Sequence, residues 1–171
     1  MATVILKWNP NFSSYSMYHF LYDVINTNYG VTDDFDWSVW DYEKIHEGDK
    51  FYWVKLGYGQ IGIVGQGVIT SEPWVGEDWS GKGRKTYYVN FVPNILINPD
   101  ALPILTSSTL ASRIPDFEWD HGHSGLVLDD TQAEKLDNLW EAFLNEHKDE
   151  FETKANTDRR GNDIIYWNRD E

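Results

Sequence analysis

The sequence predicts an α+β fold in which a small β-barrel is flanked by helices. The main observation is a strand at residues 60–69, where three glycines, Gly62, Gly65 and Gly67, stand among Ile and Val residues. Glycine weakens a strand, so three of them indicate strong coiling or the close approach of another segment. A small closed barrel needs such strands. An aromatic strand at residues 50–55 and an apolar stripe on a C-terminal helix complete the pattern.

Size and composition restrict the class of protein. The 171 residues fit one domain, whose core is large enough to be stable without covalent staples. The absence of cysteine excludes a thiol nucleophile, a Cys-ligated zinc site and a disulfide scaffold. No basic N-terminal region precedes a long apolar stretch, and no run approaches the roughly 18 apolar residues of a membrane span. We expect a soluble, unexported, cytoplasmic protein that has no membrane partner.

The N-terminal part predicts a strand followed by a helix. Residues 4–8 form an apolar first strand, and a helix begins at Met17 with Ser16 as its N-cap and Gly30 past its end. Four apolar residues of this helix fall at helical spacing: Phe20, Leu21, Val24 and Ile25.

The middle of the chain predicts strands separated by short helices. The expected elements are a helix at 41–46, strands at 50–55, 60–69 and 86–92, and a helix at 106–113. Pro99 and Pro103 interrupt the segment between the last strand and the last helix, and Pro115 stops that helix.

A longer helix closes the domain. Thr131 and Glu134 fit a capping box at its start. Its apolar stripe consists of Leu136, Leu139, Trp140, Phe143 and Leu144. We therefore expect a domain at residues 1–147 and a polar C-terminal extension at 148–171. Within the extension, residues 164–167 predict a strand that adds to a sheet edge or contacts another copy, as in a homodimer.

The order of several short motifs resembles a known superfamily. These motifs are Trp8-Asn9-Pro10, Trp37-Ser38, Gly48-Asp49, and a Gly-rich strand, GIVGQGV, that ends near Ser71-Glu72-Pro73. Over roughly residues 3–145 the chain resembles the PUA-like superfamily and is most similar to EVE-type domains. These are related to YTH readers and to the base-reading modules of modification-dependent restriction systems. The resemblance implies a PUA-like barrel at residues 1–147.

The resemblance also implies a ligand pocket. In YTH and EVE relatives, a Trp followed by a small polar residue lies at the mouth of a pocket, where the indole stacks on a base. It thus implies Asn9, Trp37 and Ser38 as pocket residues, with Lys55, Trp79, Arg84 and His123 at the rim. The structural alternative is that Trp37 or Trp40 attaches the short helix at 41–46 to the barrel.

Charge decides which nucleic-acid partners are compatible with the sequence. A net charge of −14 argues against non-specific duplex binding, which depends on Lys and Arg neutralising phosphates. Stacking on aromatic faces contributes about 1–3 kcal/mol per base without any phosphate contact, and the chain has nine Trp, ten Tyr and eight Phe. The expected partner is a modified DNA or RNA base that is single-stranded or flipped.

A glycine-rich loop carries the one tight basic cluster before the extension, formed by Lys82, Arg84 and Lys85. The loop lacks the spacing of a P-loop. It predicts either a contact with a phosphate or a mobile hairpin whose charge is balanced by Glu77 and Asp78.

The segment Asp120-His121-Gly122-His123-Ser124-Gly125 allows three interpretations. Two His residues two positions apart can share a metal ion, and His with Ser suits nucleophilic chemistry. A turn whose histidines bind backbone or line a pocket is the third. We expect no tightly bound metal and no cofactor. The function classes are thus a modified-base binding module, a small-molecule or protein-interaction domain with an acidic surface, and a hydrolase using His121 and His123.

Overall fold

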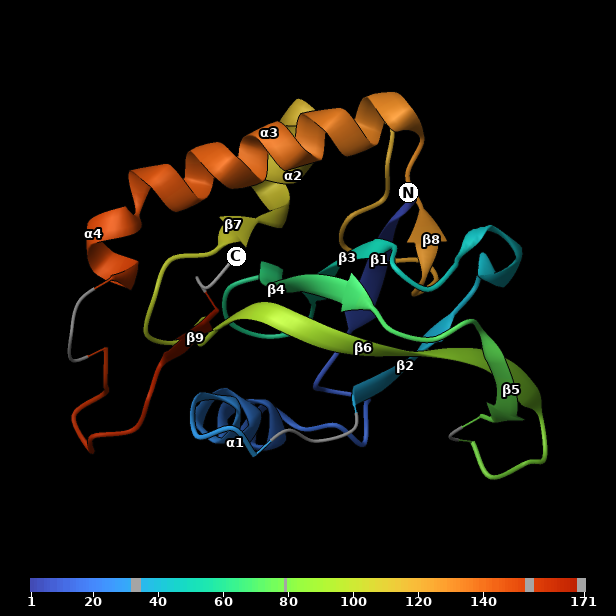
Figure 1. Ribbon diagram of the computed structural model, residues 1–171, viewed down its shortest axis with the longest axis horizontal. Coiled ribbons are helices and arrows are strands. Elements are labelled where there is room, and N and C mark those ends of the chain that lie inside the picture. The colour runs from blue at the N-terminus through green and yellow to red at the C-terminus, as the bar shows by residue number, and fades with distance from the viewer. Residues whose placement is uncertain (32–34, 79, 153–155, 169–171) are drawn as a thin grey trace.

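The computed structural model describes residues 1–31, 35–78, 80–152 and 156–168 as a curled mixed sheet with helices on both sides (Figure 1). The nine strands are β1 (Thr3–Trp8), β2 (Phe35–Val39), β3 (Lys50–Lys55), β4 (Gly62–Ile69), β5 (Trp74–Glu77), β6 (Lys85–Ile97), β7 (Leu105–Thr106), β8 (Leu126–Val127) and β9 (Ile165–Trp167). The helices are α1 (Met17–Asn28), the 3-10 turn η1 (Tyr42–Lys44), α2 (Ser107–Arg113), α3 (Asp130–Glu146) and α4 (Lys148–Phe151). The predicted α+β, barrel-like architecture is confirmed.

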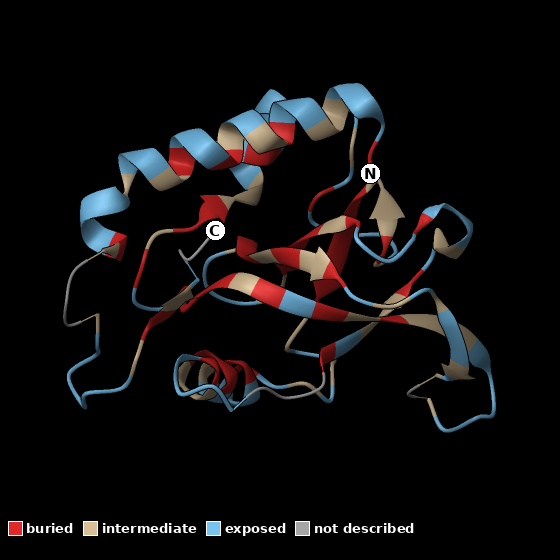
Figure 2. Ribbon diagram, in the orientation of Figure 1, coloured by how far each residue is buried: buried red, intermediate tan, exposed pale blue. Residues whose placement is uncertain are grey.

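The sheet runs in the order β2-β6-β4-β3-β1-β8, with β5 and β9 added to β6 and β7 added to β4. β1 is parallel to β3, and the other pairs are antiparallel. Helices α1 and α3 lie on opposite sides of this sheet, and the buried residues line the faces between them (Figures 1 and 2). None of the helices in the described ranges is both long and apolar enough to span a membrane.

The glycines of β4 permit the close backbone approach that the sequence predicts. A Cβ atom on Gly67 would lie 2.1 Å from the carbonyl oxygen of Val92, and one on Gly62 would lie 2.2 Å from that of Leu105. The pairing of β4 with β6 also shifts register between Gln66 and Gly67. Side chains at these positions would push β6 and β7 away, so the curl of the sheet depends on glycine.

Helix α1 begins and caps as expected, because the Ser16 side chain accepts a hydrogen bond of 3.1 Å from the N–H of His19. The predicted capping box of α3 is wrong. The box consists of Asp129 and Gln132, whose side chains each accept a hydrogen bond from the other's backbone N–H, at 2.7 and 3.0 Å. The helix therefore starts before Thr131.

Two other predicted boundaries are wrong. The helix expected at 41–46 is the single 3-10 turn η1. The strand expected at 86–92 extends to Ile97, through Pro93. Pro93 pairs with Gly67 where the ladder shifts register, so the backbone N–H that proline lacks is not required at an irregular point of the ladder.

The C-terminal extension packs onto the same chain. Strand β9 pairs antiparallel with β6, and the Asn28 side chain of α1 donates a hydrogen bond of 2.8 Å to the carbonyl of Ile165. Phe151 of α4 is 2% exposed. The extension thus completes the edge of this sheet, while a homodimer formed through it stays a prediction.

Candidate functional site

The barrel has a seam between β1 and β2, which share no strand pairing among the described residues. Ser124 and Gly125 fill one half of this seam. The Ser124 hydroxyl accepts from the N–H of Lys7 at 2.9 Å, and the Ser124 carbonyl accepts from the N–H of Trp40 at 2.9 Å. The N–H of Gly125 donates to the carbonyl of Ile5 at 2.7 Å. Through these bonds Ser124 and Gly125 bridge β1 and the residue that follows β2, on the two sides of the seam.

Gly125 is required at this point. Its φ is +80°, in the left-handed region, and an added Cβ would lie 2.3 Å from the Cα of Val39. The glycine of this motif thus allows the segment just before β8 to approach Val39 at the end of β2.

The two histidines of the same motif contact side chains that do not form a catalytic arrangement with them. The ring of His123 stacks on Trp40 with centroids 3.7 Å apart and planes at 6°. His121 contacts Asp120 at 2.7 Å and Glu118 at 3.3 Å, and the hydrogen bond that its ring donates to the Asp120 carboxylate is the main cause that raises the pKa of His121. No hydrogen bond joins either histidine to the Ser124 hydroxyl in the part of the chain that the structure describes. In that part, no three His, Asp or Glu side chains converge to hold a metal ion.

The other half of the seam is open and forms a cavity of about 670 Å³, which we call the seam cavity. This volume is within the usual range of ligand pockets, about 300–1,000 Å³. Its lining comes from the end of β1 and the loop after it, from two residues of α1, from β2, from one residue of β3 and from two residues of β6. The lining residues are Lys7, Trp8, Asn9, Phe12, Ser13, Ser14, Tyr15, His19, Asp23, Phe35, Asp36, Trp37, Ser38, Trp53, Tyr88 and Phe91.

Aromatic rings form much of the cavity's surface. Trp8 and Trp53 are buried beneath it, with centroids 5.6 Å apart, whereas Tyr15 and Trp37 are half-buried. Trp37 meets Trp53 edge-on at 5.3 Å and Tyr15 at 5.7 Å. Edge-to-face pairs of this kind are favourable and hold the ring orientations.

The three indole N–H groups differ in their partners. That of Trp37 donates to the carbonyl of Lys7 at 2.9 Å, and that of Trp8 donates to the carbonyl of Tyr15 at 2.7 Å. The N–H of Trp53 is buried and has no acceptor among the described residues. A buried donor without a partner costs about 1–3 kcal/mol.

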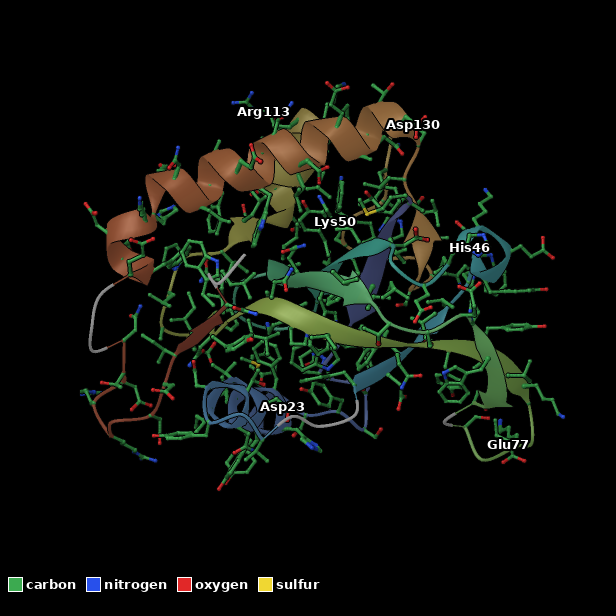
Figure 3. The ribbon with its side chains drawn as sticks, in the orientation of Figure 1. Asp23, His46, Lys50, Glu77, Arg113 and Asp130 are labelled. Carbon is green, nitrogen blue, oxygen red and sulfur yellow. The ribbon has the colours of Figure 1, made fainter. Side chains whose placement is uncertain are left out.

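The fixed charges that face the cavity are acidic. Asp23, on α1 (Figure 3), is 3% exposed and accepts a hydrogen bond from the Tyr15 hydroxyl, and Asp36 lines the mouth from β2. Lys7 also lines the cavity, but its ammonium donates to the carbonyls of Glu118, at 2.6 Å, and His121. Burial is the main cause that lowers the pKa of Lys7.

Three of the residues that the sequence analysis singled out lie together. Asn9, Trp37 and Ser38 all line the seam cavity, although Asn9 lies 28 positions before Trp37 in the chain. The Asn9 side-chain oxygen accepts from the N–H of Asn11 at 3.0 Å, while its NH2 group has no partner within the described ranges. Asn9 therefore offers two donors near the aromatic rings.

The four expected rim residues lie elsewhere or cannot be placed. Lys55 is fully buried, and its ammonium donates to the carbonyls of Tyr58 and Gln60 at 2.5 and 3.0 Å, which is a structural role. Arg84 is exposed on the turn between β5 and β6, and His123 stacks on Trp40. None of these three lines the seam cavity. Trp79 lies outside the described residues.

The sequence analysis did not single out Tyr15, His19 or Asp23. Asp23 did leave a signal, because it falls three residues after Phe20 on the apolar face of α1. A carboxylate on the buried face of a helix needs a partner, and here it has the Tyr15 hydroxyl. Tyr15 precedes the N-cap and shows no periodicity that marks it.

No family model matches the sequence, and no curated protein does. Among solved structures, the fold is similar to that of a hypothetical protein from Leishmania major, with a TM-score of 0.54 and 14% identity, covering 84% of this chain and 96% of that one. Protein PSPTO5229 from Pseudomonas syringae has a TM-score of 0.49 and 16% identity, with 81% and 99% covered. A YTH domain-containing protein, mmi1, solved in complex with RNA, has a TM-score of 0.49 and 10% identity, with 86% of each chain covered. At 14% identity, the likeness to the Leishmania protein shows a shared fold alone.

Proposed function

We propose that this protein binds a modified or extruded nucleobase in the seam cavity. The observation that supports this proposal is the convergence of Trp37, Ser38 and Asn9 on one cavity of about 670 Å³ that contains further aromatic rings. A planar base stacked on an aromatic face gains about 1–3 kcal/mol. Polar groups beside the ring then discriminate between bases by their edges.

The orientation of Trp37 suits it to this role. Its indole N–H is bound to the carbonyl of Lys7, so the ring is held in place before any ligand arrives. A ring that is already fixed loses little side-chain entropy on binding, which favours affinity. Strand β2 pairs with β6 on one side, and its other edge faces the seam. Backbone N–H and C=O groups on that edge supply further hydrogen-bonding groups for a base.

The charge of the protein favours a base over a phosphate backbone as the main point of contact. With a net charge of −14, long-range attraction to nucleic acid is absent, and binding has to come from stacking and hydrogen bonds. A single-stranded or flipped base in DNA or RNA fits this description, as does a free nucleoside.

A titration of the protein with nucleosides and single-stranded oligonucleotides, modified and unmodified, at two salt concentrations, tests the proposal. We expect Trp37→Ala to weaken binding by about 1–3 kcal/mol, or about 5- to 150-fold. Trp40→Ala is the matched control, because Trp40 is 58% exposed and lies outside the cavity. No binding by any of these ligands, or equal affinity for wild type and Trp37→Ala, would reject the proposal.

A second candidate is a small-molecule or protein-interaction domain. The acidic groups Asp23 and Asp36 at the cavity, together with the acidic composition, favour it. The same titration separates the two candidates, since this one predicts no affinity for any base. Arg84→Gln adds a further distinction: if the β5–β6 turn contacts a phosphate, this change reduces the salt dependence of oligonucleotide binding.

A further inference from the structure

We infer that the seam cavity selects a cationic, N-methylated nucleobase, of the kind represented by 3-methylcytosine and 1-methyladenine, over a neutral base. This inference rests on the proposed function and specifies its ligand class. Methylation at a ring nitrogen of these bases fixes a positive charge on the ring at neutral pH. Methylation at a carbon or an exocyclic amine leaves the ring neutral.

The charged groups around the cavity favour a cationic ligand. The titratable and charged groups that line it are Lys7, Tyr15, His19, Asp23, Asp36 and Tyr88. The Lys7 ammonium is already bound by the carbonyls of Glu118 and His121. No Arg and no second Lys lines the cavity among the residues described. The carboxylates of Asp23 and Asp36 therefore set the sign of the potential that a ligand meets.

The depth of Asp23 makes its charge effective. The side chain is 3% exposed, and the Tyr15 hydroxyl, which donates to it, fixes the orientation of the carboxylate. A charge in a poorly hydrated site interacts more strongly with a ligand charge and is screened less by salt than a surface charge. A phosphate is repelled from the same place, so a nucleotide would enter with its base inward and its phosphate toward solvent.

The aromatic rings of the cavity also favour a cationic ligand. The faces of Trp, Tyr and Phe carry negative potential, and a cation over such a face is attracted to it. Tyr15 and Trp37 are half-buried and pack against each other and against the buried Trp53, so a ligand here meets these two rings with a further ring behind them. A cationic base gains from this arrangement in addition to the stacking that any base obtains.

The hydrogen-bond donors favour a base over a methylated ammonium group. The NH2 group of Asn9, which lines the cavity, has no acceptor in the described part of the chain. A nucleobase offers ring nitrogens or a carbonyl oxygen as acceptors, and its exocyclic amine offers donors to Asp23 and Asp36. A quaternary ammonium group offers neither.

Isomeric nucleosides allow a direct test by isothermal titration calorimetry at neutral pH. The nucleosides 3-methylcytidine and 5-methylcytidine differ only in the position of the methyl group and in the proton that makes the first a cation at neutral pH, while the second is neutral. The same holds for 1-methyladenosine and N6-methyladenosine. We expect the cationic isomer of each pair to bind at least about tenfold more tightly, which corresponds to about 1.4 kcal/mol.

Variants show whether the carboxylates cause this preference. Asp23→Asn keeps the shape of the side chain and a hydrogen-bond acceptor for Tyr15. It should bring the ratio of the affinities for the cationic and the neutral isomer close to 1. Asp36→Asn, at an exposed position, should reduce it less and serves as the second measurement should Asp23→Asn not fold. Asp116→Asn removes the same charge at an exposed position outside the cavity and should leave the preference unchanged.

The outcomes separate this inference from the proposed function. Equal or tighter binding of the neutral isomers overturns the cationic preference and leaves base binding intact. A preference that persists unchanged in both Asp23→Asn and Asp36→Asn also overturns it. No binding of any nucleoside overturns both, and binding of N-acetyl-trimethyllysine in that case would identify the site as one for methylated ammonium groups.

Discussion

The indole N–H of Trp37 donates a hydrogen bond of 2.9 Å to the backbone carbonyl of Lys7. This bond joins β2 to β1 across the part of the seam that no strand pairing closes. It also fixes the ring that forms one wall of the seam cavity. The closure of the barrel and the shape of the candidate site therefore depend on the same side chain.

Trp37→Phe tests the structural half of this relationship. Phenylalanine keeps a ring but lacks the donor, so the carbonyl of Lys7 loses its partner. We expect the free energy of unfolding, measured by urea denaturation, to fall by about 1–3 kcal/mol. Trp40→Phe, at a largely exposed position, should change it by no more than about 0.5 kcal/mol. Equal losses in the two variants would show that the hydrogen bond does not stabilise the seam.

Gly125→Ala tests the role of the segment that fills the other half of the seam. The φ of Gly125 is +80°, and the new Cβ would lie 2.3 Å from the Cα of Val39. Gly81 is the matched control, since its φ is +72° but a Cβ there would have nothing within 4 Å. Both variants incur the left-handed penalty of about 1–2 kcal/mol, and we expect Gly125→Ala to be destabilised by clearly more than that in urea denaturation. Similar losses would contradict a tight approach of Gly125 to Val39 of β2.

Phe151→Ala tests whether the C-terminal extension belongs to the folded unit. Removing a buried Phe side chain typically costs about 3–5 kcal/mol, and Phe151 is 2% exposed. We expect a single unfolding transition at a clearly lower urea concentration. Phe12→Ala is the control, because Phe12 is 77% exposed and should change stability by no more than about 0.5 kcal/mol. An extension that only trails in solvent would give the two variants the same stability.

Local signals in the sequence were sufficient for part of the fold. Ser16 could be recognised as an N-cap and Gly62, Gly65 and Gly67 as points of close approach, because the physical reason for each lies within a few residues or within one strand. The capping box was misplaced since Asp129 with Gln132 and Thr131 with Glu134 fit the same pattern two residues apart. Which pair forms it depends on where the preceding chain leaves β8, and that is set by tertiary contacts.

The candidate site was less accessible to sequence reasoning. Asn9, Trp37 and Ser38 were singled out through a resemblance and lie around one cavity. Ser124 bonds to Lys7 across 117 positions, and no local pattern specifies such a contact. Lys55 illustrates the opposite difficulty. A lysine at the end of a strand suggests an exposed charge, yet the loop after it returns two carbonyls that bury and bind its ammonium.

His46, labelled in Figure 3, and Glu72 form an exposed pair whose charges depend on pH. His46 Nδ1 and a Glu72 carboxylate oxygen are 2.9 Å apart. This hydrogen bond is the main cause that raises the pKa of His46 above 6.5, and the charge of Glu72 adds to it. The same bond is the main cause that lowers the pKa of Glu72 below 4.5, followed by the hydrogen bond that Glu72 accepts from the N–H of Glu47.

The sign of each shift gives the pH range of the stabilisation. A raised pKa of His46 in the folded state stabilises the fold fully below pH 6.5, and this contribution is lost as the pH rises through the folded pKa. A lowered pKa of Glu72 stabilises the fold above pH 4.5, and this contribution is lost as the pH falls through its folded pKa. The pair therefore contributes most to stability between pH 4.5 and 6.5.

In an NMR titration of the histidine rings, we expect Glu72→Gln to lower the pKa of His46 toward 6.5. His121 in the same sample should keep its raised pKa, because its partners are Asp120 and Glu118. A pKa of His46 that is unchanged in Glu72→Gln would show that the carboxylate is not its partner in solution.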